Sequence, residues 1–444
     1  MNIWNKYHQS FLSLSLAALL CFTFLISSAD VKASNKSTSK KTIESSVIKK
    51  TLSVKKAKNQ KTSNQKMKKI KKLNLNAWKV SYNWNGTSEM EKKKGMLVIK
   101  NTEFNHACYT QTVSVKPHTN YRIRALVRVD NYKQGKQNPG GVTVGYGDPS
   151  KYACLENDFI TSNKWKQSEA WFCSGKNKKV TLYVANGGFA AITKGTAYIK
   201  DIILEELDTN NKWNVLALIY KNIKTPTYQD SFSDTDVKEL KTILEKVPDS
   251  FKRLSNKRML INTMDIKVID KPVKTISDSE SAYAGTLTYG RGNDINFDQY
   301  LKGKDYNQII IYAPTWKLVL QNDKKEQWGG LGGTYYRYKG RNIYTCIINI
   351  GPNVAGIPSV DIYGENYDSR ICFIVHEMLH CVETNSRLRG YSDFTALHDG
   401  KDHGYVDSRE VEWMDYYSDL MKDTIKSGAK GFYKTSFYVP HMPK

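Results

Sequence analysis

The chain has 444 residues, of which 40% are hydrophobic and 25% are charged, and its formal net charge is +24. This length exceeds what a single core usually organises, so we expect two folded domains with extensions. Residues 34–72 hold fourteen lysines and one acid, Glu44, so more than half of the excess charge lies in one tail. That placement argues against a nucleic-acid-binding surface, and we expect no nucleic-acid partner.

Residues 1–33 have the features of a secretory signal peptide. Lys6 precedes an apolar run from residue 11 to residue 26, and Ala29 and Ala33 are candidate cleavage positions. A retained membrane anchor is the alternative, although the run is short for one. We therefore expect a secreted, extracellular protein, able to associate with the cell wall and free of the membrane after cleavage.

Residues 34–72 are rich in Lys, Ser, Thr, Asn and Gln, with only scattered aliphatic side chains. Such a composition cannot bury enough apolar surface to offset the entropy of ordering, so we predict a disordered linker. Its charge suits adhesion to an anionic cell-wall polymer. A merely solvated spacer explains the same composition equally well.

Residues 73–207 consist of short alternating runs separated by turn signals such as those at 138–141 and 186–188. Seven or eight strands at this spacing predict a β-sandwich. The order "CYTQTVSVKPHTNYRIRALVRV", then "WKQSEAWF", then "GTAYIKDIILEEL" resembles jelly-roll carbohydrate-binding modules. The resemblance implies an all-β jelly-roll domain with a glycan-binding role.

Five aromatic residues of this segment could stack on sugar rings: Trp78, Trp84, Tyr146, Trp165 and Trp171. The alternative is that they belong to the core. Trp165 and Trp171 fall on alternating strand positions and are expected to be core residues. Trp84 lies in the polar stretch "YNWNGT" and is the better candidate for an exposed platform.

Residues 208–444 mix strand and helix patterns. We predict a helix from Asp234 that ends at Pro248, strands within 258–269, 307–314 and 344–351, a helix from Ile371 whose far end Gly390 marks, and a last helix within 408–425. Strands that come first and helices that follow describe an α+β domain.

The stretch "ICFIVHEMLHCVE" carries the chemistry of this second domain. On a helix, His376 and His380 project from one face and can bind one ion, while Glu377 can reach a water on it. A zinc ion lowers the pKa of such a water, and the glutamate accepts the proton. Apolar residues at helical spacing would bury the helix. Two core histidines beside a fortuitous glutamate are the alternative.

Over residues 371–383 the sequence resembles the zincin clan of HExxH zinc metallopeptidases. Glu383 and Ser386 stand where a metzincin has glycine and a third histidine, so the chain is not a metzincin. The glycine-rich segment 327–351 resembles the edge strand that zincins lay along a peptide substrate. An ordinary hairpin with a glycine bulge explains that segment equally well.

The third zinc ligand is open among His398, Glu410 and His403, and we favour His398 because the chain has room to turn back towards the metal after residue 390. Glu383 is expected to support the ligands. Tyr405 is a candidate to stabilise the oxyanion with its hydroxyl, and a packed tyrosine is the alternative.

The sequence therefore predicts a secreted zinc endopeptidase that cleaves a protein or peptide substrate. Zn²⁺ would be held by His376, His380 and His398, and Glu377 would be the general base. The N-terminal module would bind a glycan or an anionic wall polymer. A zinc amidase acting on cell-wall peptide and a non-catalytic surface adhesin are the alternatives. An intact Glu377 argues against the adhesin, because a structural zinc site needs no base.

Overall fold

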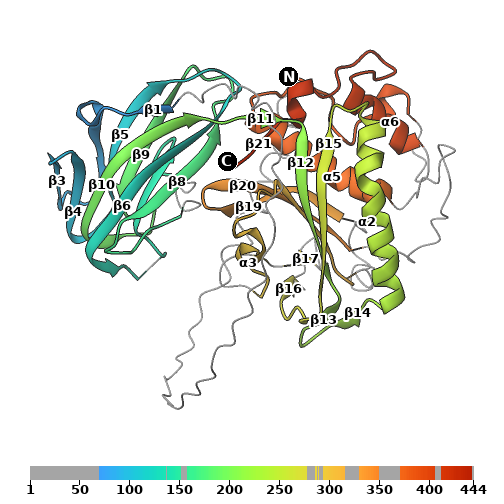
Figure 1. The fold of residues 1–444 in the computed structure, drawn as a ribbon, viewed down its shortest axis with the longest axis horizontal. Helices are drawn as coiled ribbons and strands as arrows, with labels where there is room; N and C mark the ends of the chain where they lie inside the picture. The colour runs from blue at the N-terminus through green and yellow to red at the C-terminus, as the bar shows by residue number, and fades with distance from the viewer. Residues whose placement is uncertain are drawn as a thin grey trace, which may run out of the picture. The chain divides into compact units, whose positions relative to one another are not determined.

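The computed structural model describes residues 70–136, 138–151, 158–277, 286–287, 289, 294–315, 330–349, 371–405 and 412–442, with the backbone alone at 412 and 413. These residues belong to one compact unit (Figure 1). The expected signal peptide, residues 34–69 of the expected linker and Glu410 lie outside the described residues. Within those ranges no helix is both long enough and apolar enough to cross a bilayer.

Two antiparallel sheets form a β-sandwich in the N-terminal part of the described chain. The first sheet has the order β3 (Ser88–Lys93), β4 (Met96–Asn105), β10 (Thr193–Glu206), β6 (Asn120–Gln134) and β8 (Lys166–Cys173), and β1 (Ile70–Lys72) also pairs with β10. The second has the order β2 (Lys79–Asn83), β5 (Ala107–Ser114), β9 (Lys179–Asn186) and β7 (Val142–Tyr146). A 3₁₀ turn, Leu75–Ala77, precedes β2. The expected all-β sandwich is thus present.

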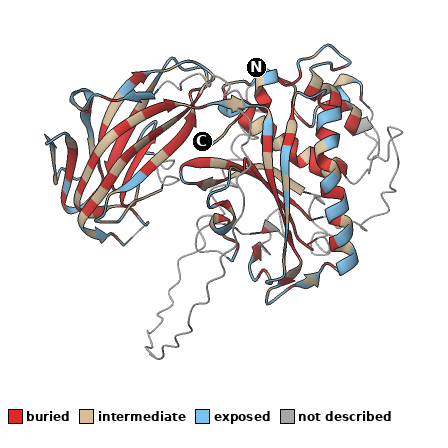
Figure 2. Ribbon diagram, viewed as in Figure 1, coloured by how far each residue is buried: buried red, intermediate tan, exposed pale blue. Residues whose placement is uncertain are grey.

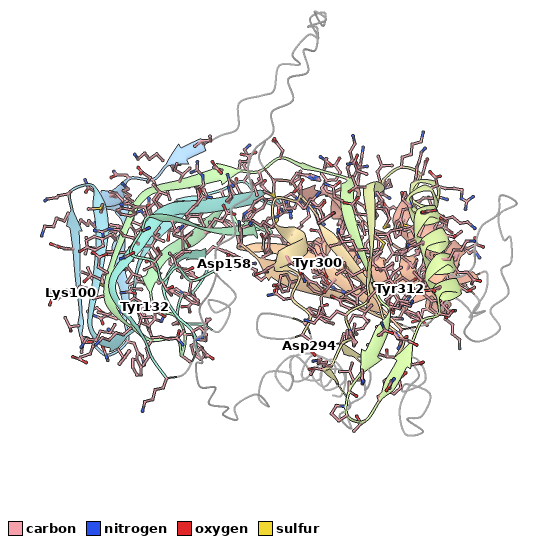
Figure 3. The ribbon with its side chains drawn as sticks, turned by 60° about the horizontal axis from the view of Figure 1, so that its bottom comes forward. Lys100, Tyr132, Asp158, Asp294, Tyr300 and Tyr312 are labelled. Atoms are coloured by element: carbon pink, nitrogen blue, oxygen red, sulfur yellow. The ribbon has the colours of Figure 1, made fainter. Side chains whose placement is uncertain are left out.

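Strand β6 shows why the sheets stack. Its side chains alternate between buried Ile123, Ala125, Val127 and Val129 and half-buried residues that include three arginines. A period of two places one set in the core between the sheets and the other on the outer face. Outer-face pairs such as Lys100 with Glu89 are exposed to solvent (Lys100 is labelled in Figure 3).

The expected linker ends earlier than residue 72. Ile70, Lys71 and Lys72 form β1 and pair with Ile203, Leu204 and Glu205 of β10. The pairing satisfies backbone groups at the edge of β10 that would otherwise face water, and this tertiary gain is absent from the lysine-rich composition on which the prediction rested.

The aromatic residues of the sandwich divide by environment. Trp84 is 59% exposed, whereas Trp78 is fully buried. Trp171 is buried, as expected. Trp165 is only half-buried, because it precedes β8 on the outer face, where Arg128 and Lys200 lie over its ring at 5.4 and 4.4 Å. Tyr146 is 37% exposed and its ring stacks on Phe172. Trp84 is therefore the most exposed of the five candidate aromatics, as the sequence indicated.

A five-stranded mixed sheet organises the C-terminal part, with the order β15 (Leu260–Ile269), β12 (Lys212–Tyr220), β18 (Gln308–Tyr312), β20 (Arg341–Ile348) and β19 (Gly330–Tyr338). The first four strands are parallel, and β19 is antiparallel to β20. The expected α+β order is wrong in this respect, because α2 (Asp234–Leu254) connects two parallel strands, β12 and β15, as in α/β folds.

Helices α2, α5 (Ile371–Leu388) and α6 (Glu412–Lys422) pack on one face of this sheet (Figure 1). The other face is covered by the short hairpins β13 (Asn222–Lys224) with β14 (Gln229–Ser231) and β16 (Ile276–Ser277) with β17 (Thr286–Leu287), and by α3 (Asp298–Leu301). The 3₁₀ turns Gly400–His403 and Lys434–Phe437 and the pair β11 (Thr209–Asn210) with β21 (Val439–Pro440) complete the described elements. Central strands are buried on both faces (Figure 2).

Helix α2 does not end at Pro248 as expected, but continues to Leu254. Leu244, Val247, Phe251 and Leu254 are all buried at helical spacing against the sheet. Their burial holds the helix together past the proline, whose missing N–H would stop a helix that lacked such packing.

Candidate metal centre

Helix α5 carries the HExxH stretch and lies over the last two strands of the sheet. Its inner face, which includes Ile374, Val375, Met378 and Leu379, is fully buried in the core shared with α2 and α6. Gly390, with φ of 84°, follows the end of the helix, as the sequence indicated. Packing along its whole length gives α5 a fixed position, and His376 and His380 one turn apart share its half-buried face.

Three histidines converge at this face. The Nε2 atom of His380 lies 3.2 Å from the Nε2 atom of His376 and 3.2 Å from that of His398. All three residues offer ligand atoms within 4.8 Å of one another. Two nitrogens bound to one tetrahedral zinc at about 2.05 Å stand about 3.4 Å apart. The separations of the His380 nitrogen from those of His376 and His398 therefore fit two nitrogens on one zinc-sized ion, and the three rings together form a group that could hold a metal.

The environment favours the neutral form of His376 and His398. Burial, with the nearby His380 and His398 rings, lowers the pKa of His376 to about 2. Burial likewise lowers the pKa of His398, against the opposing effect of Glu383 and Asp399. A neutral imidazole keeps the nitrogen lone pair that a metal requires, so this electrostatic setting favours ligation.

Two rings are oriented through their second nitrogen. The Nδ1 atom of His376 lies 2.5 Å from the Tyr417 hydroxyl on α6. The Nδ1 atom of His380 lies 3.2 Å from a Glu383 carboxylate oxygen, as expected from the sequence. Such partners fix the ring and the tautomer, so that the Nε2 atoms of His376 and His380 are the ones turned towards each other. The sequence analysis missed Tyr417, because it lies 41 residues from His376 on a different helix, and no local spacing pattern links the two.

His398 reaches the cluster from the loop after α5. The preceding residue, Leu397, is fully buried in the core beneath α5. The Ala396 carbonyl accepts a hydrogen bond from Tyr416 of α6, and the Ala396 amide donates to Asp399 at 3.3 Å. Ala396 and Leu397 thus anchor the loop immediately before the solvent-exposed His398 ring, and Asp399 closes a turn around it.

Strand β19 lies directly on Glu377. A Cβ added to Gly330 would stand 2.5 Å from the Glu377 Cγ, and one added to Gly332 would collide with the Glu377 carbonyl oxygen. At Gly333 the nearest atoms would be those of Thr384 and His380. Only glycine permits this approach of strand to helix. Among the described strands β19 pairs with β20 alone, so it is an edge strand. It also forms an antiparallel hairpin with β20 whose register shifts between Leu331 and Thr334, as the alternative of a hairpin with a glycine bulge predicted.

Glu377 is 4% exposed. Burial raises its pKa to about 7, although His380 and the Gly332 amide act in the opposite direction by favouring the carboxylate. A carboxyl group with a pKa near neutrality is suited to accept and release a proton at physiological pH.

The other candidates lie differently. The Tyr405 hydroxyl donates to Asp419 at 2.6 Å and accepts from the Lys426 amide at 3.1 Å, so the structure gives no support to the oxyanion role expected of Tyr405. His403 Nδ1 contacts the Ser427 hydroxyl at 2.8 Å and is not part of the cluster. Glu410 is outside the described residues.

No protein-family profile and no curated protein matches the chain. Among solved structures, a CBM4 module is 14% identical, with 28% of this chain and 85% of that chain covered at a TM-score of 0.20. A CBM61 module in complex with β-1,4-galactotriose is 16% identical, with 29% of this chain and 86% of that chain covered at a TM-score of 0.20. The xylan-binding module CBM86 from Roseburia intestinalis is 12% identical, with 32% of this chain and 97% of that chain covered at a TM-score of 0.20. These scores are too low to carry an argument about function.

The role of Tyr417 can be tested through metal affinity. Tyr417→Phe removes the hydroxyl that orients His376 and should weaken zinc binding by roughly 10- to 100-fold. Competition with a chromophoric chelator measures this. Tyr405→Phe removes a hydroxyl bound to Asp419 instead, so it should leave the affinity unchanged. Equal affinities in Tyr417→Phe and the unaltered protein would contradict the orienting role.

Proposed function

We propose that this chain is a secreted zinc-dependent endopeptidase. The observation that carries the proposal is the convergence of the His376, His380 and His398 Nε2 atoms beside the buried carboxyl group of Glu377. His376, His380 and His398 would hold the ion. When bound, zinc lowers the pKa of a water molecule and polarises a substrate carbonyl.

In this proposal Glu377 accepts the proton of the attacking water and passes it to the leaving amine. Its position supports the role, because it follows His376 on α5 and its Oε1 lies 3.9 Å from the His376 Nε2. The Gly332 amide of β19 favours the carboxylate. A group that must take and return a proton in one cycle works best with a pKa near the working pH.

Strand β19 supplies the substrate-binding element in this proposal. Among the described strands β19 pairs with β20 alone, and apart from Gly332 and Gly333, whose backbone groups contact α5, its other side can pair with an extended peptide. The strand passes over Glu377, so a peptide bound there would bring a backbone carbonyl near the three histidines. This geometry favours an extended peptide over a compact substrate.

A zinc amidase acting on cell-wall peptide uses the same groups and is the second candidate. Water activation by His376, His380, His398 and Glu377 does not distinguish a peptide bond between protein residues from an amide in a wall peptide. A non-catalytic adhesin is the third. It has no use for a buried carboxyl group directly beside the ligands.

We also propose that the sandwich binds a glycan through Trp84. Three exposed aromatic side chains lie on adjoining strand ends: Trp84 at 59%, Phe104 at 37% and Phe189 at 43% exposure. The Trp84 amide donates to the His106 carbonyl at 3.0 Å, and Asn85 Nδ2 donates to the Phe104 carbonyl at 3.0 Å. Flat exposed rings suit the apolar faces of sugars.

The purified mature protein should contain about one zinc per chain, because three side chains and a water complete a tetrahedral catalytic site. Elemental analysis measures this, and a chelator should abolish hydrolysis of a denatured protein substrate. His398→Ala should lose most of the metal, whereas His403→Ala, which removes a ring outside the cluster, should keep it. Zinc-free protein after gentle purification would overturn the enzyme proposal.

Glu377→Gln should keep the metal and lower kcat by roughly 100- to 10,000-fold, because an amide cannot accept the proton of water. Steady-state hydrolysis of a peptide together with zinc content separates the two effects. Glu383→Gln is the matched control: it alters a carboxylate that contacts His380 only at Nδ1, so it should act mainly on metal affinity. Wild-type turnover in Glu377→Gln would remove the glutamate from the chemistry.

Trp84→Ala should reduce retention of the protein on insoluble cell-wall polysaccharide by several-fold, because the ring that would stack on sugar is lost. Pull-down at high salt measures this without the contribution of the lysine-rich tail. Val80→Ala, which trims a side chain of similar exposure at 56%, should bind as the unaltered protein does. Unchanged retention in Trp84→Ala would locate any glycan site elsewhere.

A further inference from the structure

The sandwich contacts the rest of the compact unit at the chain segment that follows α5. His118 Nδ1 lies 2.6 Å from the Arg389 carbonyl oxygen, and the Arg389 guanidinium donates to the His118 carbonyl at 2.9 Å. The His118 ring also stacks on Tyr391, with centroids 4.7 Å apart and planes at 7°. A Cβ at Gly390 would stand 2.8 Å from the Lys176 amide nitrogen. The end of α5 is therefore bonded to the sandwich and packed against it.

A second contact lies at the turn between β19 and β20. The Trp171 amide of β8 donates to the Gly340 carbonyl at 2.9 Å. Gly340 has φ of 70°, and a Cβ there would stand 2.7 Å from the Ala170 Cα and collide with the Glu169 carbonyl oxygen. The Arg341 guanidinium, nearly inaccessible to solvent, lies 4.8 Å from the centre of the Trp171 ring. Backbone and side chains thus fix this turn on the sandwich.

The two contacted elements are the walls of the metal centre. Helix α5 carries His376, Glu377 and His380, and its end at Leu388 is about 12 Å beyond His380 at 1.5 Å per residue. Strand β19 runs from the glycines over Glu377 to the turn held by Trp171. The sandwich thus holds the far end of both elements that meet at Glu377.

Strand β19 and helix α5 are in close contact at Glu377. With no room for a methyl group between β19 and Glu377, a displacement of either element would open or close the contact of the Gly332 amide with the carboxylate. An edge strand has one neighbouring strand to hold it, so its free side depends on other contacts. Misplacement of a reacting group by about 1 Å can lower a rate by on the order of 100-fold.

We infer that the sandwich is a positioning part of the catalytic machinery. Through His118 at the end of α5 and Trp171 at the β19–β20 turn, it sets the spacing of the two walls across Glu377. This role is separate from any glycan that the sandwich binds, and it rests on the proposed peptidase function. His118 and Trp171 act as positioning residues, because they reach the site only through α5 and β19.

Alanine substitutions at glycines test this in the full mature protein. Gly340→Ala and Gly390→Ala each insert a methyl group between the sandwich and one wall. Gly95→Ala and Gly428→Ala are matched controls: their φ values, 74° and 77°, impose similar backbone strain, but nothing lies within 4 Å of the added methyl. The first pair should lower kcat on a short peptide by roughly 10- to 100-fold with a smaller change in KM, and the controls should match the unaltered protein.

Amide hydrogen exchange separates this inference from the peptidase proposal, because it needs neither zinc nor turnover. Gly390→Ala should accelerate exchange in the last turns of α5, and Gly340→Ala should accelerate it in β19, while the controls leave both protected. Should a glycine variant fail to fold, His118→Ala removes the contact without adding atoms, and His118→Asn should restore a side-chain donor to the Arg389 carbonyl. The inference would be overturned if Gly340→Ala and Gly390→Ala showed the exchange rates and kcat of the unaltered protein. It would also be overturned if the Gly95→Ala and Gly428→Ala controls lost as much protection and kcat as they do.

Discussion

The contact between β19 and α5 at Glu377 is the constraint on which the rest of the site depends. Gly330 and Gly332 bring the strand backbone against a carboxyl group that sits between helix and sheet, and a side chain at either position would separate them. The approach removes water from the carboxyl group, and this burial is the main cause of the raised pKa of Glu377. Glycines in a strand weaken its intrinsic stability, so their presence here is explained by this packing and not by β propensity.

The same burial lowers the pKa of His376 and His398, whereas it raises that of Glu377. Burial favours the neutral form of an imidazole and of a carboxylic acid alike, so His376 is held without charge at physiological pH while the buried acid beside it takes up protons more readily. The candidate cation site thus contains a buried imidazole, His376, that carries no charge at physiological pH. The Tyr417 hydroxyl and the Glu383 carboxylate then decide which nitrogen of each ring is turned to the common point.

The sandwich and the mixed sheet have separate apolar cores, and the contacts between them are of another kind. The guanidinium groups of Arg341, from the mixed-sheet side, and Arg122, from its own sheet, approach the Trp171 ring at 4.8 and 5.7 Å. The two loop contacts consist of hydrogen bonds to backbone groups, one ring stack and close glycine approaches. Directional contacts of this type define a relative position more strictly than an apolar patch of similar size, because a hydrogen bond is lost with a small displacement.

The sequence by itself determined those features that depend on neighbours within one element. The spacing of His376 and His380, the adjacent Glu377, the alternation in the strands of the sandwich, the end of α5 at Gly390 and the exposure of Trp84 all follow from local periodicity and polarity, which the chain carries wherever it folds. The tertiary structure decided the rest. His398 and not His403 joins the cluster, the Tyr417 hydroxyl contacts His376, and the Tyr405 hydroxyl donates to Asp419. Helix α2 continues past Pro248, and residues 70–72 pair with a sheet. Each of these outcomes depends on contacts between segments far apart in the chain, whose energies no local pattern records.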